Sequence, residues 1–490
     1  MKVQRRKWLA AIVLALAVAG MADAARAQQR VGEVVETSIA SPSPYPDGSA
    51  QRPVVWRHTL HHPGATFLKL RFAKLAVAGS VDGATPDGDY LVVRSPDGSQ
   101  SELLGGSGVE VWTRAVSGDT AVVELHADEA GSAAGVEIDA YGYGTVPLEA
   151  ASVCGDDESS GICDASRAER VALSRAVARL LFASDCGGMF VCTGFLFSPD
   201  GLLMTNAHCA NSGRESRSME VWFNYTQLGD APRQPDCSLA DRPNPDVFRA
   251  RRLVESDCAL DVAVHRMDPR KGRNPAEIYG FLPLSARTPE AGEAVWLPQH
   301  PSGGPQRIAE TGIVSASAAA GIDYCDDRPG CDGAGAPTGV DSDFAHTADT
   351  SGGSSGSPVL DEENRVIGLH HAGGCTAQGG DNAAVLMARI LPLLGKAPKA
   401  RLVTEPRAAG PAPLVLHLDG SRSRDPDGGA IVEYRFDPGD GSPVVVGPEP
   451  RVVHAYANVG RFEARLWVVD DEGTSAKRPA VRRVVVRSPD

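Results

Sequence analysis

Short runs in which apolar and polar residues alternate, separated by turn residues, recur along most of the chain. Residues 66–72 (TFLKLRF), 90–94 (YLVVR) and 121–125 (AVVEL) are clear examples. A repeat of two residues is typical of a β-strand, because successive side chains point to opposite faces. With 53 glycines and 35 prolines to form turns in 490 residues, the sequence predicts a mainly β protein. The length indicates about three domains.

The first residues have the features of a secretory signal. Four basic residues between Lys2 and Lys7 precede an apolar run over 8–21, and small residues at 22–24 or 25–27 offer cleavage sites. The apolar run is short for a membrane span, which needs about 20 residues. We therefore expect a signal peptide at 1–27, export from the cell to the periplasm or the medium, and no membrane anchor after cleavage.

The cysteines mark out a central domain. All ten lie between Cys154 and Cys375, and no CxxC pair typical of a zinc site occurs. Export favours disulfides, so we expect five bridges and no metal. The net charge of −14 and the lack of a long basic block argue against nucleic acid as a partner.

The pattern also predicts the domain boundaries. An N-terminal β-sandwich is expected over 28–149, the cysteine-rich domain over 150–396, an Ala- and Pro-rich linker over 397–413 and a compact β unit over 414–490. Helices are predicted at 165–181 and at 386–394, where apolar residues recur at helical spacing.

Two segments of the central domain offer a base and a carboxylate. His208 lies in TNAHC (205–209), which follows a strand and a turn, and Asp261 directly precedes the apolar run 262–264. A carboxylate in such a place is costly to bury unless a partner compensates it, and the His208 imidazole is the expected partner. An ordinary strand histidine and a turn aspartate are the alternatives.

A third segment, SGGSSGSPV (351–359), offers a nucleophile. Its glycines permit the sharp turn that would direct the N–H groups of Gly353 and Ser355 into one small space, as an oxyanion hole requires. In a Gly-x-Ser-Gly turn such as 353–356, the residue before the second glycine is the one presented, so Ser355 is the expected nucleophile. A flexible linker is the alternative, but strand-like sequence on both sides disfavours it.

The order His, Asp, Ser and the motifs TNAHC, DVAV and GSSGSP resemble the chymotrypsin clan of serine proteases. The resemblance implies a double β-barrel and hydrolysis of peptide bonds in protein substrates through an acyl-enzyme, without a cofactor. Within the clan the region 150–395 is most similar to the bacterial lysyl endopeptidases. That family also implies an N-terminal prosegment, which matches the domain at 28–149.

The same resemblance implies disulfide pairs and specificity residues. By position the pairs are Cys154–Cys375, Cys163–Cys237 and Cys192–Cys209, with Cys325–Cys331 and Cys186–Cys258 proposed for the remaining cysteines. Cleavage after Lys or Arg would use Asp349 or Asp381. The segment 355–374 is equally similar to the glutamyl endopeptidases, in which Thr350 and His370 would hold a glutamate, so specificity stays open at this point.

The C-terminal unit resembles the PKD domain, an immunoglobulin-like sandwich appended to secreted hydrolases, through FDPGDG (436–441) and the strands around it. The resemblance implies that the C-terminal unit is a spacer or a module that binds protein or polysaccharide. We expect a monomeric endopeptidase; an inactive homologue that acts as a binding or adhesion protein is the alternative.

Overall fold

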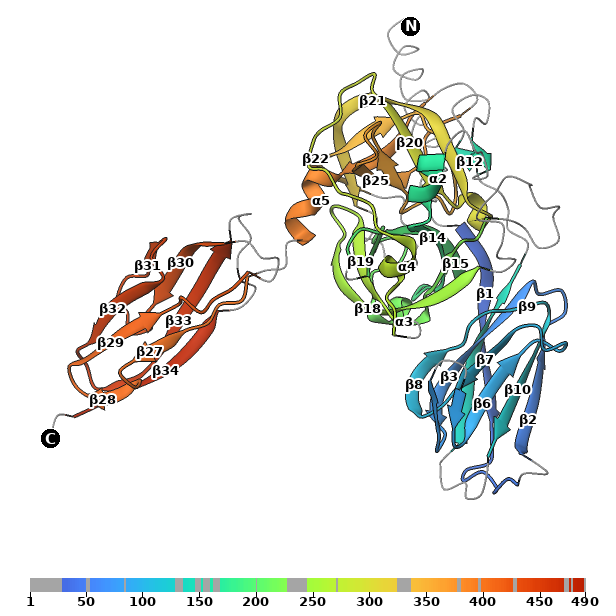
Figure 1. Cartoon of the computed structure of the whole chain (residues 1–490), viewed down its shortest axis with the longest axis horizontal. Coiled ribbons are helices and arrows are strands. Elements are labelled where there is room, and N and C mark those ends of the chain that lie inside the picture. Colours follow the sequence, from blue (N-terminus) through green and yellow to red (C-terminus); the bar gives the residue numbers. More distant parts are fainter. Residues whose placement is uncertain are drawn as a thin grey trace, which may run out of the picture. The chain divides into compact units, whose positions relative to one another are not determined.

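The computed structural model describes residues 29–49, 53–82, 85–127, 135–145, 151–152, 159–161, 168–199, 201–226, 245–269, 272–323, 336–376, 380–394, 398–425, 430–470, 476 and 479–488. The chain divides into two compact units, Met1–Arg389 and Ile390–Asp490 (Figure 1). The mainly β architecture predicted from the sequence is confirmed, with a double barrel of chymotrypsin type in the first unit and a β-sandwich in the second.

The N-terminal part of the first unit is a sandwich of two antiparallel sheets. Their inward residues, among them Leu70, Phe72 and Val123, are fully buried and form one core. One sheet has the order β1-β11-β3-β8, with β9 paired to β3, and the other has the order β2-β10-β6-β7. The strands are β1 (Gln29–Ala40), β2 (Val54–His61), β3 (Phe67–Ala76), β6 (Tyr90–Arg94), β7 (Ser101–Leu104), β8 (Ser107–Trp112), β9 (Val116–Ser117), β10 (Thr120–His126) and β11 (Gly135–Gly144), with the small hairpin β4 (Ser80–Asp82) and β5 (Thr85–Asp87).

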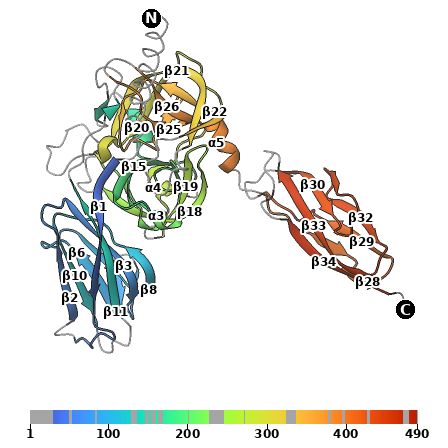
Figure 2. The same ribbon diagram turned by 180° about the vertical axis from the view of Figure 1, so that it is seen from behind.

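Two closed six-stranded barrels follow, and Figure 2 shows them from behind. The first comprises β14 (Val177–Ala183), β15 (Met189–Leu196), β16 (Leu202–Thr205), β17 (Glu220–Phe223), β18 (Asp246–Asp257) and β19 (Val262–Met267). The second comprises β20 (Ala294–Gln299), β21 (Arg307–Asp323), β22 (Ala336–His346), β24 (Pro358–Leu360), β25 (Val366–Ala372) and β26 (Asn382–Leu386). Short elements complete the unit: β12 (Ala151–Ser152), β13 (Ser160–Gly161), α2 (Ala168–Ser174), α3 (Gly213–Ser218), α4 (Pro275–Tyr279), η2 (Pro301–Gly303), β23 (Thr350–Ser351) and α5 (Met387–Leu394).

One helix prediction is wrong in part. Of the described residues in the expected helix over 165–181, Ala168–Ser174 form a helix and Val177 to Leu181 belong to β14. Every residue of β14 is buried, so its sequence is apolar on both faces and does not alternate. Such a run resembles the apolar face of a helix. The helix expected at 386–394 is present as α5.

The sandwich and the first barrel share a buried seam. Val31 and Trp112 of the sandwich form one apolar cluster with Leu181, Ala183, Met189 and Val191 of the barrel. Beside it Lys69 Nζ lies 2.5 Å from Glu220 Oε1, and both side chains are almost fully buried. Glu220 also accepts hydrogen bonds from the Ala115 N–H and the Trp222 indole. The seam therefore has the composition of a domain interior, with an ion pair whose charges are compensated.

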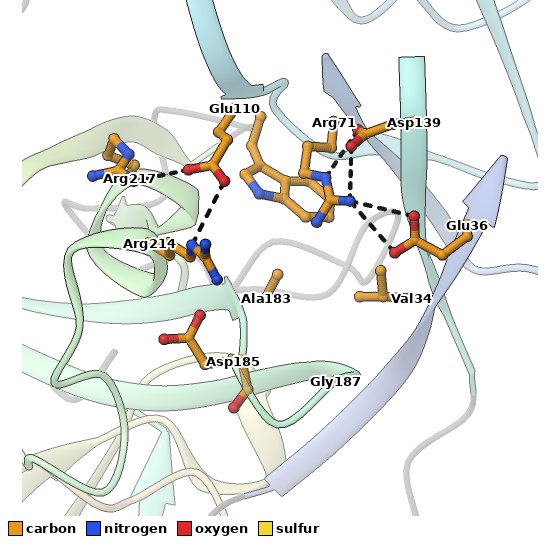
Figure 3. A pocket seen from close by; sticks show the side chains of 12 residues that line it. Val34, Glu36, Arg71, Glu110, Asp139, Ala183, Asp185, Gly187, Arg214 and Arg217 are labelled. Atoms are coloured by element: carbon orange, nitrogen blue, oxygen red, sulfur yellow. Dashed lines mark hydrogen bonds and ion pairs between the residues drawn. The ribbon is translucent and has the colours of Figure 1, made fainter. Parts of the chain in front are cut away.

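A polar cavity of about 390 Å³ opens at the edge of this seam. Figure 3 shows Glu110 between Arg214 and Arg217, and Arg71 between Glu36 and Asp139. Glu110 thus pairs with two arginines of the barrel side, whereas Arg71 pairs with Glu36 and Asp139 inside the sandwich.

The C-terminal unit is a sandwich with its own core, which includes Leu416, Phe436, Tyr456 and Leu466. Its sheets have the orders β27-β29-β32 and β28-β34-β33-β30-β31. The strands are β27 (Val403–Glu405), β28 (Ala409–Pro411), β29 (Leu414–Asp419), β30 (Ile431–Asp437), β31 (Val445–Gly447), β32 (Arg451–Tyr456), β33 (Gly460–Asp470) and β34 (Ala480–Arg487).

The linker predicted over 397–413 is wrong in part, because β27 and β28 lie inside it and pair with β29 and β34. The Ala- and Pro-rich composition is typical of a linker, but β27 and β28 lie at the edges of their sheets, where proline is tolerated.

Candidate active site

The TNAHC segment begins at the last residue of β16, and several of its side chains are bonded to neighbouring backbone or cysteine atoms. Thr205 Oγ1 donates to the Thr193 carbonyl on β15 (2.8 Å), and Asn206 Nδ2 donates to the Asp261 carbonyl (2.9 Å). The predicted Cys192–Cys209 disulfide is formed and joins β15 to the same segment. His208 is therefore presented by a rigid piece of the first barrel.

His208 and Asp261, 53 residues apart in sequence, are in direct contact. His208 Nδ1 lies 2.7 Å from Asp261 Oδ2, and the His208 backbone N–H donates to Oδ1 (2.9 Å). Asp261 has no exposed surface and a backbone φ of +43°, an unusual conformation for a residue other than glycine. Its carboxylate thus orients both the ring and the backbone of His208.

A second histidine bonds to the same carboxylate. His371, on β25 of the second barrel, lies with Nδ1 3.2 Å from Asp261 Oδ2 and Nε2 2.9 Å from Asp343 Oδ2. Burial alone would lower the pKa of His371, but the hydrogen bonds to Asp261 and Asp343 raise it to about 9. Burial likewise opposes ionisation of Asp261, yet His208 and His371 hold the pKa of Asp261 below its ordinary value.

Sequence reasoning missed His371 and Asp343. The available signal was the pair His370-His371 inside an apolar strand, because consecutive strand residues face opposite sides and a strand buried on both faces requires a partner for each ring.

The segment that carries the candidate nucleophile follows β23 as a tight turn. Gly353 and Gly356 have φ values of +96° and +89°, and a Cβ at Gly356 would lie 2.0 Å from the Thr193 carbonyl oxygen. Ser355 itself is 3 % exposed, and its carbonyl accepts from the Thr193 N–H (2.8 Å). The Cys209 Sγ lies 3.9 Å from the same carbonyl, so Ser355 is beside the segment that carries His208.

Two carbonyl groups of this turn are held by neighbouring elements. The Gly352 carbonyl accepts from the Ser302 N–H (2.7 Å) and the Gly353 carbonyl from Thr193 Oγ1 (2.9 Å). In a trans peptide the N–H points opposite to the carbonyl, so the first bond directs the Gly353 N–H away from Ser302. The Ser354 carbonyl accepts from the Ser357 N–H, and this bond directs the Ser355 N–H away from Ser357.

Three backbone segments near Ser355 are joined by one amide. Asn382 is fully buried; its Nδ2 donates to the Ala348 carbonyl (2.7 Å) and its Oδ1 accepts from the Gly374 N–H (2.9 Å). This bond set fixes the spacing between the residues that precede Thr350 and those that follow His371.

The candidate specificity residues differ in burial. Asp349 and Thr350 are 6 % and 4 % exposed, whereas Asp381 is exposed. His370 is buried, with Nδ1 3.2 Å from His346 Nε2. Burial lowers the pKa of His346 to about 3 and that of His370 well below its ordinary value, so both rings are neutral.

The other predicted cysteines are described only in part. Cys186, Cys258 and Cys375 are disulfide-bonded, and their pairings stay predictions. Cys154, Cys163, Cys237, Cys325 and Cys331 lie outside the described residues, as does the signal peptide at 1–27. Cys192 and Cys209 lie close to His208, but as a disulfide they supply no thiolate for a metal. Within the described residues no helix is long and apolar enough to cross a membrane.

Two family models match parts of the chain. A trypsin-like peptidase domain matches residues 192–369, and a PKD domain matches 395–486. The pair of barrels is therefore that of a chymotrypsin-like serine peptidase. The chain is also 31 % identical over 344 residues to the secreted RxLR effector protein 73 of Plasmopara viticola, a match that covers 64 % of this chain and 76 % of that protein. The chain belongs to the same family as that effector protein.

Matches to solved structures have lower sequence identity. A protease of M. tuberculosis in its active form is 22 % identical, with 46 % of this chain and 82 % of that chain covered and a TM-score of 0.33. A Glu endopeptidase is 19 % identical, with 49 % and 97 % covered and a TM-score of 0.34.

Proposed function

We propose that the protein is a secreted serine endopeptidase in which Ser355 is the nucleophile, His208 the general base and Asp261 the residue that orients His208. The observation that carries the proposal is the 2.7 Å contact between His208 Nδ1 and a fully buried Asp261 carboxylate, beside a glycine turn that holds Ser355. Such a carboxylate selects the tautomer with the proton on Nδ1, which leaves Nε2 able to accept one.

The reaction follows from these roles. Ser355 Oγ attacks the carbonyl carbon of the scissile bond while its proton passes to His208 Nε2. The N–H groups of Gly353 and Ser355 stabilise the oxyanion. His208 then gives its proton to the leaving amine, and the acyl-enzyme forms. Water, deprotonated by His208, hydrolyses the ester and restores Ser355.

Replacement of each residue tests the roles. Ser355→Ala should abolish labelling by a fluorophosphonate and lower kcat on casein peptides by about 10⁴-fold or more, and Asp261→Asn by about 10⁴-fold. Ser357→Ala, in the same turn, is the matched control for folding. A wild-type protein that is folded but neither labels nor cleaves would support the alternative of an inactive homologue that only binds.

For substrate preference we propose cleavage after Lys or Arg, with Asp349 as the residue that receives the basic side chain. Its burial next to Thr350 supports this role, because a carboxylate shielded from water discriminates strongly between charges. Asp381 is the second candidate, and its exposure makes it the weaker one. Asp349→Asn should lower kcat/KM after Lys by at least about 100-fold.

Cleavage after Glu is supported by a different observation. His370 and His346 form a buried neutral pair, and a neutral imidazole can donate one hydrogen bond to a carboxylate. A peptide library read by cleavage site distinguishes the two. Faster turnover after Glu, lost in His370→Gln and kept in Asp349→Asn, would overturn the basic preference.

A further inference from the structure

β1, the first strand of the N-terminal sandwich, leaves that sandwich at one end and continues into the protease barrel. Residues 32–40 pair with β11 of the sandwich, whereas Gln29, Arg30 and Gly32 pair antiparallel with Val191, Phe190 and Met189 of β15. Both views show β1 reaching the barrel (Figures 1 and 2). The chain thus adds a strand of its own to the catalytic barrel.

The edge that β1 occupies adjoins the nucleophile. On one side Met189 to Val191 pair with β14, and on the other side β16 pairs only with Phe195 and Leu196. The edge of residues 189–191 that faces away from β14 is paired with β1. The next residues, Cys192 and Thr193, form the disulfide to Cys209 and bind the Ser355 and Gly353 carbonyls.

Gln29 also lies against the nucleophile turn. It is 6 % exposed, and a Cβ placed on Gly352 would lie 2.6 Å from Gln29 Oε1. Gly352 directly precedes Gly353, so the side chain at the start of β1 packs on the turn that presents Ser355.

The position of His208 indicates which half of a substrate this edge would bind. His208 must protonate the leaving amine, so the leaving half of a peptide lies on the His208 side of Ser355. A ring nitrogen of His208 and the sulfurs of Cys192 and Cys209 lie within 4.8 Å of one another. An extended peptide that crosses Ser355 toward His208 would therefore meet the 189–191 edge and add to it as a strand.

We propose that β1 is an autoinhibitory strand that occupies the binding edge for the leaving half of the substrate. The inference rests on the proposed endopeptidase function. Ser355 remains competent, but a long substrate must displace Gln29–Val31 before its leaving half can bind. Val31 holds the strand in place, because it is buried in the seam cluster and its carbonyl accepts from the Thr145 N–H (2.7 Å).

The test uses the full secreted chain and two substrates with the same acyl half. One is a p-nitroanilide, which needs little room on the leaving side, and the other is a quenched peptide with five residues there. Arg30→Pro removes a backbone N–H in the part of β1 that pairs only with β15, so the pairing with β11 is kept. Arg30→Thr is the matched control, because it loses the same side chain and keeps the strand.

We expect Arg30→Pro to raise the ratio of kcat/KM for the quenched peptide over the p-nitroanilide by at least tenfold, and Arg30→Thr to leave it unchanged. Gln29→Ala, which removes only the side chain on Gly352, should raise the ratio about threefold and covers the case in which Arg30→Pro does not fold. Equal ratios in the wild type and the folded variants, or a parallel loss with both substrates, would overturn the proposal. A wild type that neither labels with fluorophosphonate nor cleaves the p-nitroanilide would instead overturn the proposed function, and the strand proposal with it.

Discussion

His371 lies 3.2 Å from Asp261 through Nδ1, on the same carboxylate oxygen that His208 contacts at 2.7 Å. The two histidines come from different barrels, and Asp343 anchors the far nitrogen of His371 at 2.9 Å. Two imidazoles thus contact one oxygen of the Asp261 carboxylate, and the raised pKa of His371 keeps its ring protonated at neutral pH.

In the proposed reaction this arrangement would make His371 a positioning residue. We expect His371→Phe to lower kcat about tenfold with little change in KM, because the orientation of Asp261 matters in the transition state and not for substrate binding. Asp343→Asn should have a smaller effect in the same direction. His265→Gln is the control, since His265 is equally buried but bonds to Ser216 and the Ala210 carbonyl. A fall in kcat that is as large in His265→Gln would show a general loss of packing.

The raised pKa of His371 also predicts a pH dependence of stability. The pKa is 6.5 in the unfolded chain and about 9 in the folded one, so the stabilisation is complete below pH 6.5 and is lost as pH rises toward 9. The shift corresponds to about 3 kcal/mol in the free energy of unfolding. Urea denaturation of the Ser355→Ala protein between pH 6.5 and 9.5 measures it. The same series on Ser355→Ala with His371→Asn should lack this part of the decline.

The Lys69–Glu220 pair should be necessary for the seam between the sandwich and the first barrel. Burial opposes the charge on Lys69 and lowers its pKa, and Glu220 opposes that shift. Lys69→Met leaves a buried carboxylate without its main partner and should cost about 3–5 kcal/mol in denaturant unfolding. The double variant Lys69→Met/Glu220→Met should recover much of that loss. Lys74→Met, in the same strand but in a half-exposed pair with Glu137, should cost less than about 1 kcal/mol.

Asn382 should affect substrate binding more than chemistry. Asn382→Ala removes the bonds to the Ala348 carbonyl and the Gly374 N–H, and loosens the segments on either side of the candidate specificity residues. We expect KM to rise about tenfold and stability to fall by about 2–4 kcal/mol. Gln306→Ala removes a comparable buried amide that bonds to the Ser174 carbonyl, and it should lower stability without raising KM. An unchanged KM in Asn382→Ala would contradict this role.

Much of the architecture follows from local pattern. Alternation in segments such as 66–72 predicted strands, and the mainly β fold with a double barrel and a terminal sandwich is confirmed. The two errors have different causes. Residues 177–181 lie in a strand that is buried on both faces and therefore lacks alternation, whereas 403–405 and 409–411 are three-residue edge strands in an Ala- and Pro-rich segment. The spacing of apolar residues along a short segment does not determine whether one or both faces are buried, because burial depends on neighbours distant in sequence.

For the site, the sequence by itself determined the candidate groups: His208, Asp261, a serine in a glycine turn, and the Cys192–Cys209 bridge that the structure contains. The histidine, the aspartate and the serine each stand in a short contiguous motif, and the two cysteines are only 17 residues apart. Only the tertiary structure decided that His371 and Asp343 support Asp261 and that Gln29 lies on Gly352, because those contacts join segments 28 to 323 residues apart. Hydrogen bonds and packing act over a few ångströms in space, so a local pattern such as His370-His371 can indicate that a buried ring needs a partner but not which distant residue supplies it.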